Sequence, residues 1–519
     1  MRSTLTLGFE HLLSHLTHDE PSWASSCFSI LAISSLGKNH ISLRHHARHF
    51  PSILKLINTT NMTTNKTKPE FEVPLDIFGQ DPTTAFATPF VFFWPLQGQQ
   101  EISTFVARLQ LGLDKLSNAV SWVAGKVVKR SAQPGDAYPY KIVPSGPTPK
   151  LIVRDYRAAL DVPSMDELVE GRFPIRLLDE NVLSPINVLP GRADEERSAV
   201  LTIQCNWLRG GLAVNIVGHH QVLDGTGQEQ VVYLLDKACR GEAFDEEEIA
   251  AANLDRTTLL QPFDSYWQPP MDSTYIKPSP PTVVTEDPES RAPMPAVEWV
   301  NWAFPQSALA TLKSTATQSS SGDYISTDDA LTALIWQSLA RARLHRLDPA
   351  TKSTLARAVN PRRYVGIPPT YPGHVSNNAY SNLTLHELAA SPLGTIASAL
   401  RNAVDPRTSG LRETTREFAT LLLRASDRSS VNMGARLDLE CDLMVSSWAG
   451  MRCYQFDFGL GLGCPLAFRR PKQALVPSLV FLLPRRGDGE IVVKMGARAD
   501  DLEALRGDGE WTRFAEYLG

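Results

Sequence analysis

Two adjacent histidines and an aspartate form the group in this sequence best suited to acid–base chemistry. His219 and His220 are followed by Asp224 and Gly225 in the run GHHQVLDG, residues 218–225. A neutral imidazole can take a proton from a hydroxyl at pH 7, because its unperturbed pKa of about 6.5 lies near that pH. His220 is therefore the candidate general base.

The same residues allow other interpretations. A short loop could turn the Asp224 carboxylate toward a basic partner, which would make it a structural clasp and not a second catalyst. A loop histidine can also simply be satisfied by hydrogen bonds. A metal site of His219, His220 and Asp224 is a weaker hypothesis, because adjacent histidines in a strand tend to point apart and no nearby cysteine or carboxylate cluster completes a ligand set. We predict no bound metal.

The flanking residues predict a rigid support for this group. Apolar residues alternate over residues 212–217 after a pair of glycines, which is typical of a strand. Thr226 and Glu229 then stand three apart as a capping box, and apolar residues follow at helical spacing to residue 238. The histidines are thus expected on a tight loop between two regular elements, from which an imidazole can be aimed at a substrate.

A second group of residues lies far downstream. It consists of Ser446, Ser447 and Trp448, followed by DFGLG at residues 457–461. Together with HQVLDG, these blocks resemble in order and separation the His-x-x-x-Asp-Gly, Thr-Ser-Trp and Asp-Phe-Gly-Trp-Gly motifs of the BAHD acyltransferases. Segments 151–155 and 235–240 resemble the fungal branch typified by trichothecene 3-O-acetyltransferase. The resemblance extends over about residues 70–519.

The resemblance implies a fold and a reaction. The fold is α/β, with two chloramphenicol-acetyltransferase-like domains, mixed sheets and an active-site channel at the domain interface. An acyl-CoA, in the simplest case acetyl-CoA, would be the co-substrate, with no bound cofactor. The acceptor would be a hydroxyl of a fungal secondary metabolite, such as a trichothecene-like terpenoid. His220 would take the hydroxyl proton while the oxygen attacks the thioester directly.

The resemblance also implies roles for other residues. Arg362, in VNPRRY at residues 359–364, corresponds to the arginine that pairs with the motif aspartate, here Asp224. Trp448, Ser446 and Ser447 are candidates to stabilise the oxyanion or contact the substrate, although a tryptophan on an ordinary core strand is the alternative.

The DFGLG loop is expected to lie away from His220, where Asp457, Gly459 and Gly461 would shape the domain contact and the coenzyme A site. Several cations follow this loop and could meet the phosphates of coenzyme A, unless they are ordinary solvated charges. They are Arg469, Arg470, Lys472, Arg485 and Arg486.

Bulk composition limits the possible partners. The chain has 519 residues, 43% of them hydrophobic, which is enough for two cores. Its 51 basic and 56 acidic residues give a net charge of -5, which indicates neither nucleic acid nor an anionic membrane as the main partner. The six cysteines include no C-x-x-C pair, which favours a reduced, cytoplasmic setting. No uncharged apolar run approaches the roughly 20 residues needed to span a bilayer. Since one chain would hold the whole site, we expect a monomer.

Composition also predicts the domain boundaries. Residues 1–61 hold seven of the twelve histidines and are expected to be a poorly structured extension or the product of a misplaced start. Residues 62–261 would form the N-terminal domain with the catalytic loop, and residues 296–519 the C-terminal domain. Nine prolines between residues 262 and 295 predict a crossover between them.

Local patterns predict four further elements. In the first domain we expect an early strand at residues 74–78 and a helix over residues 102–113. In the second domain we expect the first segment at residues 297–304 and a helix that begins with a capping box of Ser326 and Asp329.

Two other functions are compatible with parts of the sequence. The double histidine also suits a condensation-type enzyme that takes its acyl group from a carrier protein, but the chain contains no adenylation or carrier segment. A non-catalytic ligand-binding scaffold is the second alternative, and the intact His220 and Asp224 argue against it. The sequence names neither the acceptor hydroxyl nor the acyl chain length.

Overall fold

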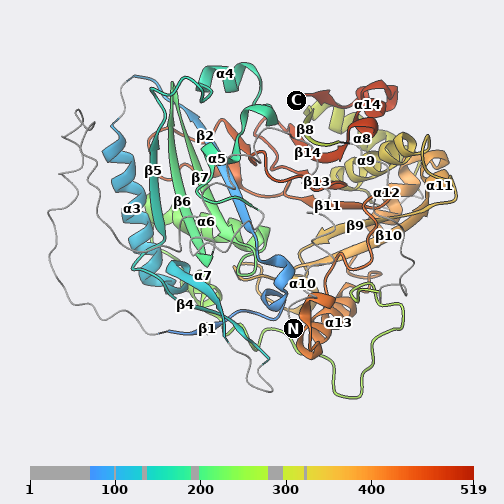
Figure 1. Ribbon diagram of the computed structural model, residues 1–519, viewed down its shortest axis with the longest axis horizontal. Coiled ribbons are helices and arrows are strands. Elements are labelled where there is room, and N and C mark those ends of the chain that lie inside the picture. Colours follow the sequence, from blue (N-terminus) through green and yellow to red (C-terminus); the bar gives the residue numbers. More distant parts are fainter. Residues whose placement is uncertain (1–70, 99–100, 131–136, 189–197, 279–295, 321–323) are drawn as a thin grey trace, which may run out of the picture. The chain divides into compact units, whose positions relative to one another are not determined.

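The computed structural model describes residues 71–98, 101–130, 137–188, 198–278, 296–320 and 324–519. These residues contain three β-sheets and belong to one compact unit (Figure 1). No helix among them is long and apolar enough to cross a membrane. The predicted extension at residues 1–61 and the second half of the predicted crossover, residues 279–295, lie outside the described residues.

The first large sheet contains the strand that leads to the histidines. Its strand order is β12-β2-β7-β6-β5, with all pairs antiparallel except β5 and β6. The strands are β2 Ala87–Pro95, β5 Lys150–Asp155, β6 Leu201–Leu208, β7 Gly211–His219 and β12 Ala467–Arg469. Strands β6 and β7 are buried along their whole length, as expected for central strands of a sheet with both faces covered.

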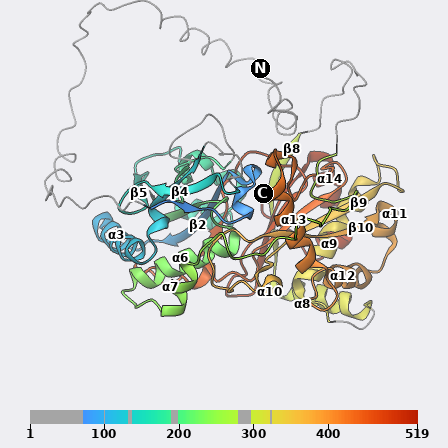
Figure 2. The same ribbon diagram turned by 90° about the horizontal axis from the view of Figure 1, so that it is seen from below.

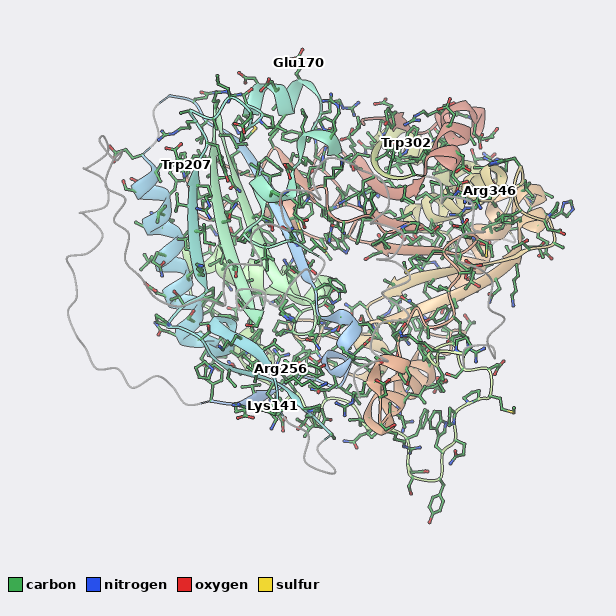
Figure 3. The ribbon with its side chains drawn as sticks, in the orientation of Figure 1. Lys141, Glu170, Trp207, Arg256, Trp302 and Arg346 are labelled. Atoms are coloured by element: carbon green, nitrogen blue, oxygen red, sulfur yellow. The ribbon has the colours of Figure 1, made fainter. Side chains whose placement is uncertain are left out.

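Helices α3 Ile102–Ala119 and α6 Gly225–Cys239 pack against each other beside this sheet (Figure 2). Helix α3 extends the predicted helix of residues 102–113 and buries Phe105, Leu109 and Leu113 at four-residue spacing. The rings of Phe105 and Trp207 on β6 pack edge to face at 5.2 Å between centroids, and Figure 3 labels Trp207. The predicted strand at residues 212–217 is the interior of β7.

A small sheet and several short helices complete the first half of the described chain. The sheet has the order β1-β4-β3, with strands β1 Val73–Pro74, β3 Gly125–Lys129 and β4 Tyr140–Pro144. The short helices are α4 Met165–Glu170, α5 Glu180–Leu183 and α7 Glu246–Ala252.

The second large sheet has the strand order β10-β9-β11-β13-β14-β8-β15. It is mixed, because β11 runs parallel to both β9 and β13 whereas the other pairs are antiparallel. The strands are β8 Val297–Phe304, β9 Lys352–Val359, β10 Asn377–Thr384, β11 Leu443–Ser447, β13 Leu479–Leu482, β14 Ile491–Arg498 and β15 Glu516–Tyr517. Strand β8 covers the predicted segment at residues 297–304.

Helix α9, Thr327–Arg343, is the central helix of the second half and is buried over most of its length. Ser326 and Asp329 form its predicted capping box, with both reciprocal hydrogen bonds present. The other helices of this half are α8 Gln306–Gln318, α10 Arg362–Val365, α11 Leu385–Ala390, α12 Leu393–Asn402, α13 Leu411–Arg424, α14 Ala499–Gly507 and α15 Gly509–Thr512. The predicted fold class, an α/β protein with mixed sheets, is confirmed.

Strand β12 departs from a simple division of the chain into consecutive halves. Its Phe468 lies opposite Phe92 of β2, so a segment of the second half extends the first large sheet. The rings of Phe90 and Phe468 meet at 5.3 Å, and Trp448 lies 5.0 Å from Phe90. The boundaries at residues 62–261 and 296–519 stay a prediction.

The strand predicted at residues 74–78 is wrong beyond Pro74. Strand β1 ends there, and a 3-10 helix follows over Phe78–Gln80. The carboxylate of Asp76 accepts a hydrogen bond from the Gly79 N–H at 3.0 Å, which bends the backbone back on itself. Asp76 is thereby turned into the interior.

Candidate active site

His220 lies one residue beyond the end of β7. Its backbone N–H donates to the Phe86 carbonyl at 2.9 Å, which anchors the turn beside the start of β2. Its ring lies 4.5 Å from the ring of Phe86 and 4.9 Å from the ring of His374, measured between centroids. The residue is partly exposed, whereas His219 before it is buried.

Burial and nearby charges set the protonation of the two histidines. Burial lowers the pKa of His220 below its ordinary value, and the Arg470 cation lowers this pKa further. The Asp224 carboxylate and the backbone carbonyl of His220 act in the opposite direction and raise it. Burial, together with the neighbouring His220, lowers the pKa of His219 to about 4. Both imidazoles are therefore neutral at pH 7, and only His220 is partly exposed.

Asp224 is the residue just before helix α6, and both of its carboxylate oxygens have partners. Its Oδ1 accepts from the Gly227 N–H at 2.7 Å, which makes Asp224 the N-cap. Its Oδ2 accepts from the Val375 N–H at 2.7 Å and lies 2.8 Å from Nη2 of Arg362. These donors hold the Asp224 carboxylate in contact with Arg362, as expected for a structural clasp. The carboxylate is not directed toward a shared metal site with His219 and His220.

The predicted capping box of Thr226 and Glu229 is wrong. Asp224 stands two residues before Thr226 and occupies the cap because Arg362 and Val375 already hold its carboxylate there. Glu229 instead accepts from Arg452, at 2.7 Å from its backbone N–H and 2.9 Å from its Nε.

Arg362 connects the loop of residues 218–225 to residues 371–375. Its guanidinium is 1% exposed and donates to the carbonyls of Tyr371 at 3.0 Å and Gly373 at 2.7 Å, besides pairing with Asp224. Its Nη1 also donates to Oδ1 of Asn360 at 3.0 Å. The structure thus brings together the two residues predicted to pair, with the arginine satisfied on every side.

Trp448 lies beside the start of α6. A Cβ added to Gly225 would stand 3.3 Å from its Nε1, so the indole N–H edge borders the loop of residues 218–225. That N–H donates to Oγ of Ser446 at 3.1 Å. The hydroxyl of Ser447 donates instead to Asp328. Of the three predicted oxyanion candidates, Trp448 lies beside this loop, whereas the Ser447 hydroxyl is hydrogen-bonded to Asp328.

The DFGLG loop packs on the opposite end of α6. Oδ1 of Asp236 accepts from the backbone N–H groups of Asp457 at 3.0 Å and Phe458 at 2.7 Å. Asp236 is twelve residues from Asp224, which corresponds to roughly 18 Å along a helix. Gly459 and Gly461 have φ of 58° and 74°, a region that favours glycine. The loop therefore lies away from His220.

The five predicted phosphate-binding cations do not gather at one surface. Arg469 and Arg470 are only 4% and 3% exposed. Arg485 donates to the Gly489 carbonyl at 3.2 Å, and Arg486 pairs with Asp488 at 2.8 Å. Lys472 is exposed.

Arg470 is instead part of the protein interior near His220. Its guanidinium stacks over the rings of Trp448 at 4.8 Å and Phe481 at 4.4 Å. Burial lowers the pKa of Arg470 to about 9, so it remains a cation at pH 7. This cation lowers the pKa of His220.

Sequence reasoning missed His374, whose ring faces His220. It stands in the segment YPGHVSN, residues 371–377, and is 1% exposed. The only local signal is a histidine after a Pro-Gly pair, 154 positions from His220 along the chain. That signal alone is too weak to single out a site residue.

Family models of known proteins match most of this chain. The model of the Transferase family matches residues 176–510, which is more than half of the chain. The chain belongs to the BAHD transferase family. The model of the trichothecene 3-O-acetyltransferase-like N-terminal domain matches residues 86–239 of this BAHD protein and so includes the loop with His220.

Individual relatives extend the match over nearly the whole BAHD fold. The trichothecene 3-O-acetyltransferase of Fusarium sporotrichioides is 38% identical over 465 residues, which are 88% of this chain and 99% of that protein. The trichothecene 3-O-acetyltransferase of Saccharomyces cerevisiae is 37% identical over 86% of this chain and 95% of its own. The crystal structure of the F. sporotrichioides protein complexed with coenzyme A and T-2 has a TM-score of 0.79 at 37% identity, covering 86% of this chain and 100% of that one. This BAHD protein is therefore an acyltransferase.

Proposed function

We propose that this protein transfers an acyl group, in the simplest case acetyl, from an acyl-CoA to a hydroxyl of a fungal secondary metabolite, with His220 as general base. The acceptor would be a trichothecene or a related terpenoid, as the names of the relatives suggest. One observation supports the base assignment most directly. His220 is a partly exposed imidazole with a lowered pKa, next to an aspartate that is committed to Arg362.

In the proposed reaction, both substrates are bound at the same time. The neutral imidazole of His220 takes the proton from the acceptor hydroxyl, and the oxygen attacks the thioester carbonyl carbon. The tetrahedral oxyanion collapses, the C–S bond breaks, and the imidazolium returns the proton to the leaving thiolate. Products are the ester and free coenzyme A, and His220 is neutral again.

Direct transfer is favoured over an acyl-enzyme intermediate. A covalent route needs a nucleophile activated beside the base. Ser447 is hydrogen-bonded to Asp328, and burial raises the pKa of the Cys205 thiol to about 12. Holding base, alcohol and thioester together removes the need for such a nucleophile.

The oxyanion needs a donor, and Trp448 is the proposed one. Its indole N–H borders the catalytic loop, and a reacting oxygen could replace Ser446 Oγ as its acceptor. The nearby Arg470 cation would add favourable electrostatics for the developing negative charge.

The remaining architectural assignments are part of the same proposal. Residues 62–261 and 296–519 would be the two acyltransferase domains, joined by the crossover at 262–295, with the channel to His220 between their sheets. Asp457, Gly459 and Gly461 would shape the coenzyme A side of that channel. Since all proposed site residues lie on one chain, a monomer suffices, and the cysteine pattern favours a cytoplasmic setting.

The test is release of free coenzyme A thiol from a panel of acyl-CoAs, with water as acceptor, by the protein and its His220→Ala variant. We expect slow hydrolysis of short acyl chains that falls about 10²- to 10⁴-fold in the variant. His219→Gln is the matched control, because it alters the adjacent buried histidine and should retain turnover. Near-normal release by His220→Ala would refute the base assignment.

The same experiment separates the alternative functions. If no thiol is released and no acyl-CoA raises the melting temperature, a carrier-protein thioester becomes the better donor. If candidate alcohols stabilise the protein without turnover of any thioester, the non-catalytic scaffold is favoured.

A further inference from the structure

Two buried carboxylates hold consecutive backbone amides of one loop. Oδ2 of Asp76 accepts from the His374 N–H at 2.9 Å, and Oδ2 of Asp224 accepts from the Val375 N–H at 2.7 Å. Asp76 pairs with Arg256 at 3.1 Å, just as Asp224 pairs with Arg362 at 2.8 Å. All four charged side chains are at most 6% exposed. The backbone at residue 374 is thus fixed from two sides.

The Asp76 pair is itself held by further contacts. Oδ2 of Asp76 also accepts from the Tyr371 hydroxyl at 3.1 Å. The Arg256 guanidinium stacks over the Trp122 ring at 4.5 Å, and Figure 3 labels this arginine. Burial raises the pKa of Asp76 to about 6, so the carboxylate is ionised at pH 7. It therefore accepts these hydrogen bonds as a full anion.

The side chain of His374 is directed at the base. Its ring is 4.9 Å from the His220 ring, with an angle of 69° between the planes. Its Nε2 is 2.6 Å from Oγ of Ser376, which limits rotation of the ring. Phe86 meets the His220 ring at 4.5 Å, so two fixed rings bound the imidazole.

We propose that His374 is a positioning residue that orients the imidazole of His220, and that the Asp76–Arg256 pair fixes His374 in that place. The inference rests on the proposed role of His220 as general base. His374 does not exchange a proton with the substrate in this scheme. It limits the orientations of His220 to those that point the base at the acceptor hydroxyl.

The charges around His374 suit this role. Burial, His220 and the Arg362 cation lower the pKa of His374 well below its ordinary value, and the Gln221 carbonyl only partly opposes them. Asp76 faces the backbone N–H of this residue, and Arg256 pairs with Asp76. His374 is thus neutral at pH 7 and does not repel the imidazolium that forms on His220 during transfer.

The test compares His374→Ala, which removes the ring, with His374→Phe, which keeps an aromatic ring at this position. We expect His374→Ala to lower kcat by about 10- to 100-fold, because a base displaced by about 1 Å loses this much. The KM for acyl-CoA should change less than about 2-fold, since no proposed coenzyme contact is removed. His374→Phe keeps a ring but loses the contact of Nε2 with Ser376, so kcat should return to within the loss of about 3- to 10-fold expected for Ser376→Ala.

The pH profile adds a readout that a loss of stability alone would not produce. In His374→Ala, water can enter beside His220 and relieve the burial that lowers its pKa. The acid limb of kcat should therefore move to higher pH in His374→Ala and stay in place in His374→Phe. Ile367→Ala is the matched control: it removes a buried side chain from the hydrophobic cluster that also contains Tyr371 and Val375, and it should lower the melting temperature while leaving kcat and the acid limb unchanged.

Three results with the variants of His374 and Ile367 would overturn the proposal. These are unchanged kcat in His374→Ala, equal losses in Ile367→Ala, or a His374→Phe variant as impaired as His374→Ala, which would assign chemistry to the ring nitrogens. If His374→Ala does not fold, Ser376→Ala decides, with kcat expected about 3- to 10-fold lower at an unchanged melting temperature, and full activity there also overturns it. His220→Ala is measured in parallel, and if it retains activity the proposed function fails independently of His374.

Discussion

Breaking the Asp224–Arg362 pair should destabilise the fold strongly. Arg362→Met keeps most of the side-chain volume but leaves the Asp224 carboxylate, 6% exposed, without its cation. It also leaves the carbonyls of Tyr371 and Gly373 without their donor. Removing one member of a buried pair costs about 3–5 kcal/mol, because the remaining charge is uncompensated. We therefore expect Arg362→Met to lower the free energy of unfolding by that amount.

The structure also ranks the variants of Asp224. Asp224→Asn keeps a side-chain oxygen for the Gly227 N–H but leaves the buried Arg362 cation without its carboxylate. It should therefore lower the free energy of unfolding by about as much as Arg362→Met. Asp224→Ala additionally loses the N-cap, worth about 1 kcal/mol. The double variant Asp224→Asn/Arg362→Met should cost less than the sum of the single variants, by about 1–3 kcal/mol, because neither charge is left alone.

An exposed ion pair supplies the control for these measurements. Arg157 contacts Asp155 at 2.7 Å, but the two side chains are 51% and 45% exposed. Such pairs contribute about 0–1 kcal/mol, so Arg157→Met should be nearly neutral. Melting temperatures by circular dichroism and urea midpoints by tryptophan fluorescence report the differences. If Arg362→Met and Asp224→Asn both unfold like Arg157→Met, the buried pair is not a clasp.

Three other perturbations have expected outcomes. The thiol-release rate should fall with decreasing pH through a pKa below about 6.5, because His220 must be neutral, and Arg470→Gln should move this limb to higher pH by removing a cation that lowers that pKa. Burial raises the pKa of the Asp76 carboxyl from its ordinary value of 3.8 to about 6 in the folded protein. Its contribution to stability is therefore full below the lower pKa and is lost as pH rises through the higher one. Urea midpoints should accordingly show the wild type losing stability relative to Asp76→Asn over that interval. Gly227→Ala should destabilise by about 1–3 kcal/mol, since its Cβ would lie 2.1 Å from the Pro372 carbonyl oxygen. A melting temperature of Gly227→Ala equal to wild type would contradict this packing.

The sequence predicts well those parts of the site that depend on neighbouring residues. Alternation over residues 212–217 identifies β7, and helical spacing after residue 225 identifies α6, because both periods follow from backbone geometry. The pairing of Arg362 with Asp224 came from the family resemblance and not from any local period. Its distance of 2.8 Å in the structure agrees with that expectation.

Residues joined over long separations could not be found this way. Asp76 is 298 positions from His374, and no period connects them. The pairing of β12 with β2 could not be predicted for the same reason, because strand pairing depends on hydrogen bonds between distant segments that local patterns do not specify.

Burial and competition between partners limit local rules as well. Thr226 and Glu229 have the spacing of a capping box, but Asp224 takes the cap because long-range donors hold its carboxylate there. Arg470 looks like a surface cation from its neighbours in the sequence, yet it is buried and packs against two aromatic rings. Neither outcome follows from residue type and spacing alone.

The geometry of Asp224 explains why the base needs support from elsewhere. In Ser-His-Asp enzymes a carboxylate binds the histidine and fixes its orientation. Here the Asp224 carboxylate accepts from Gly227 and Val375 and pairs with Arg362, and its effect on His220 is electrostatic. The orientation of His220 must then come from its backbone anchor and the flanking rings. Because Asp224 does not orient His220 directly, the proposed orientation of the base depends on the packing of neighbouring rings, and His374 supplies one that is neutral and fixed in place.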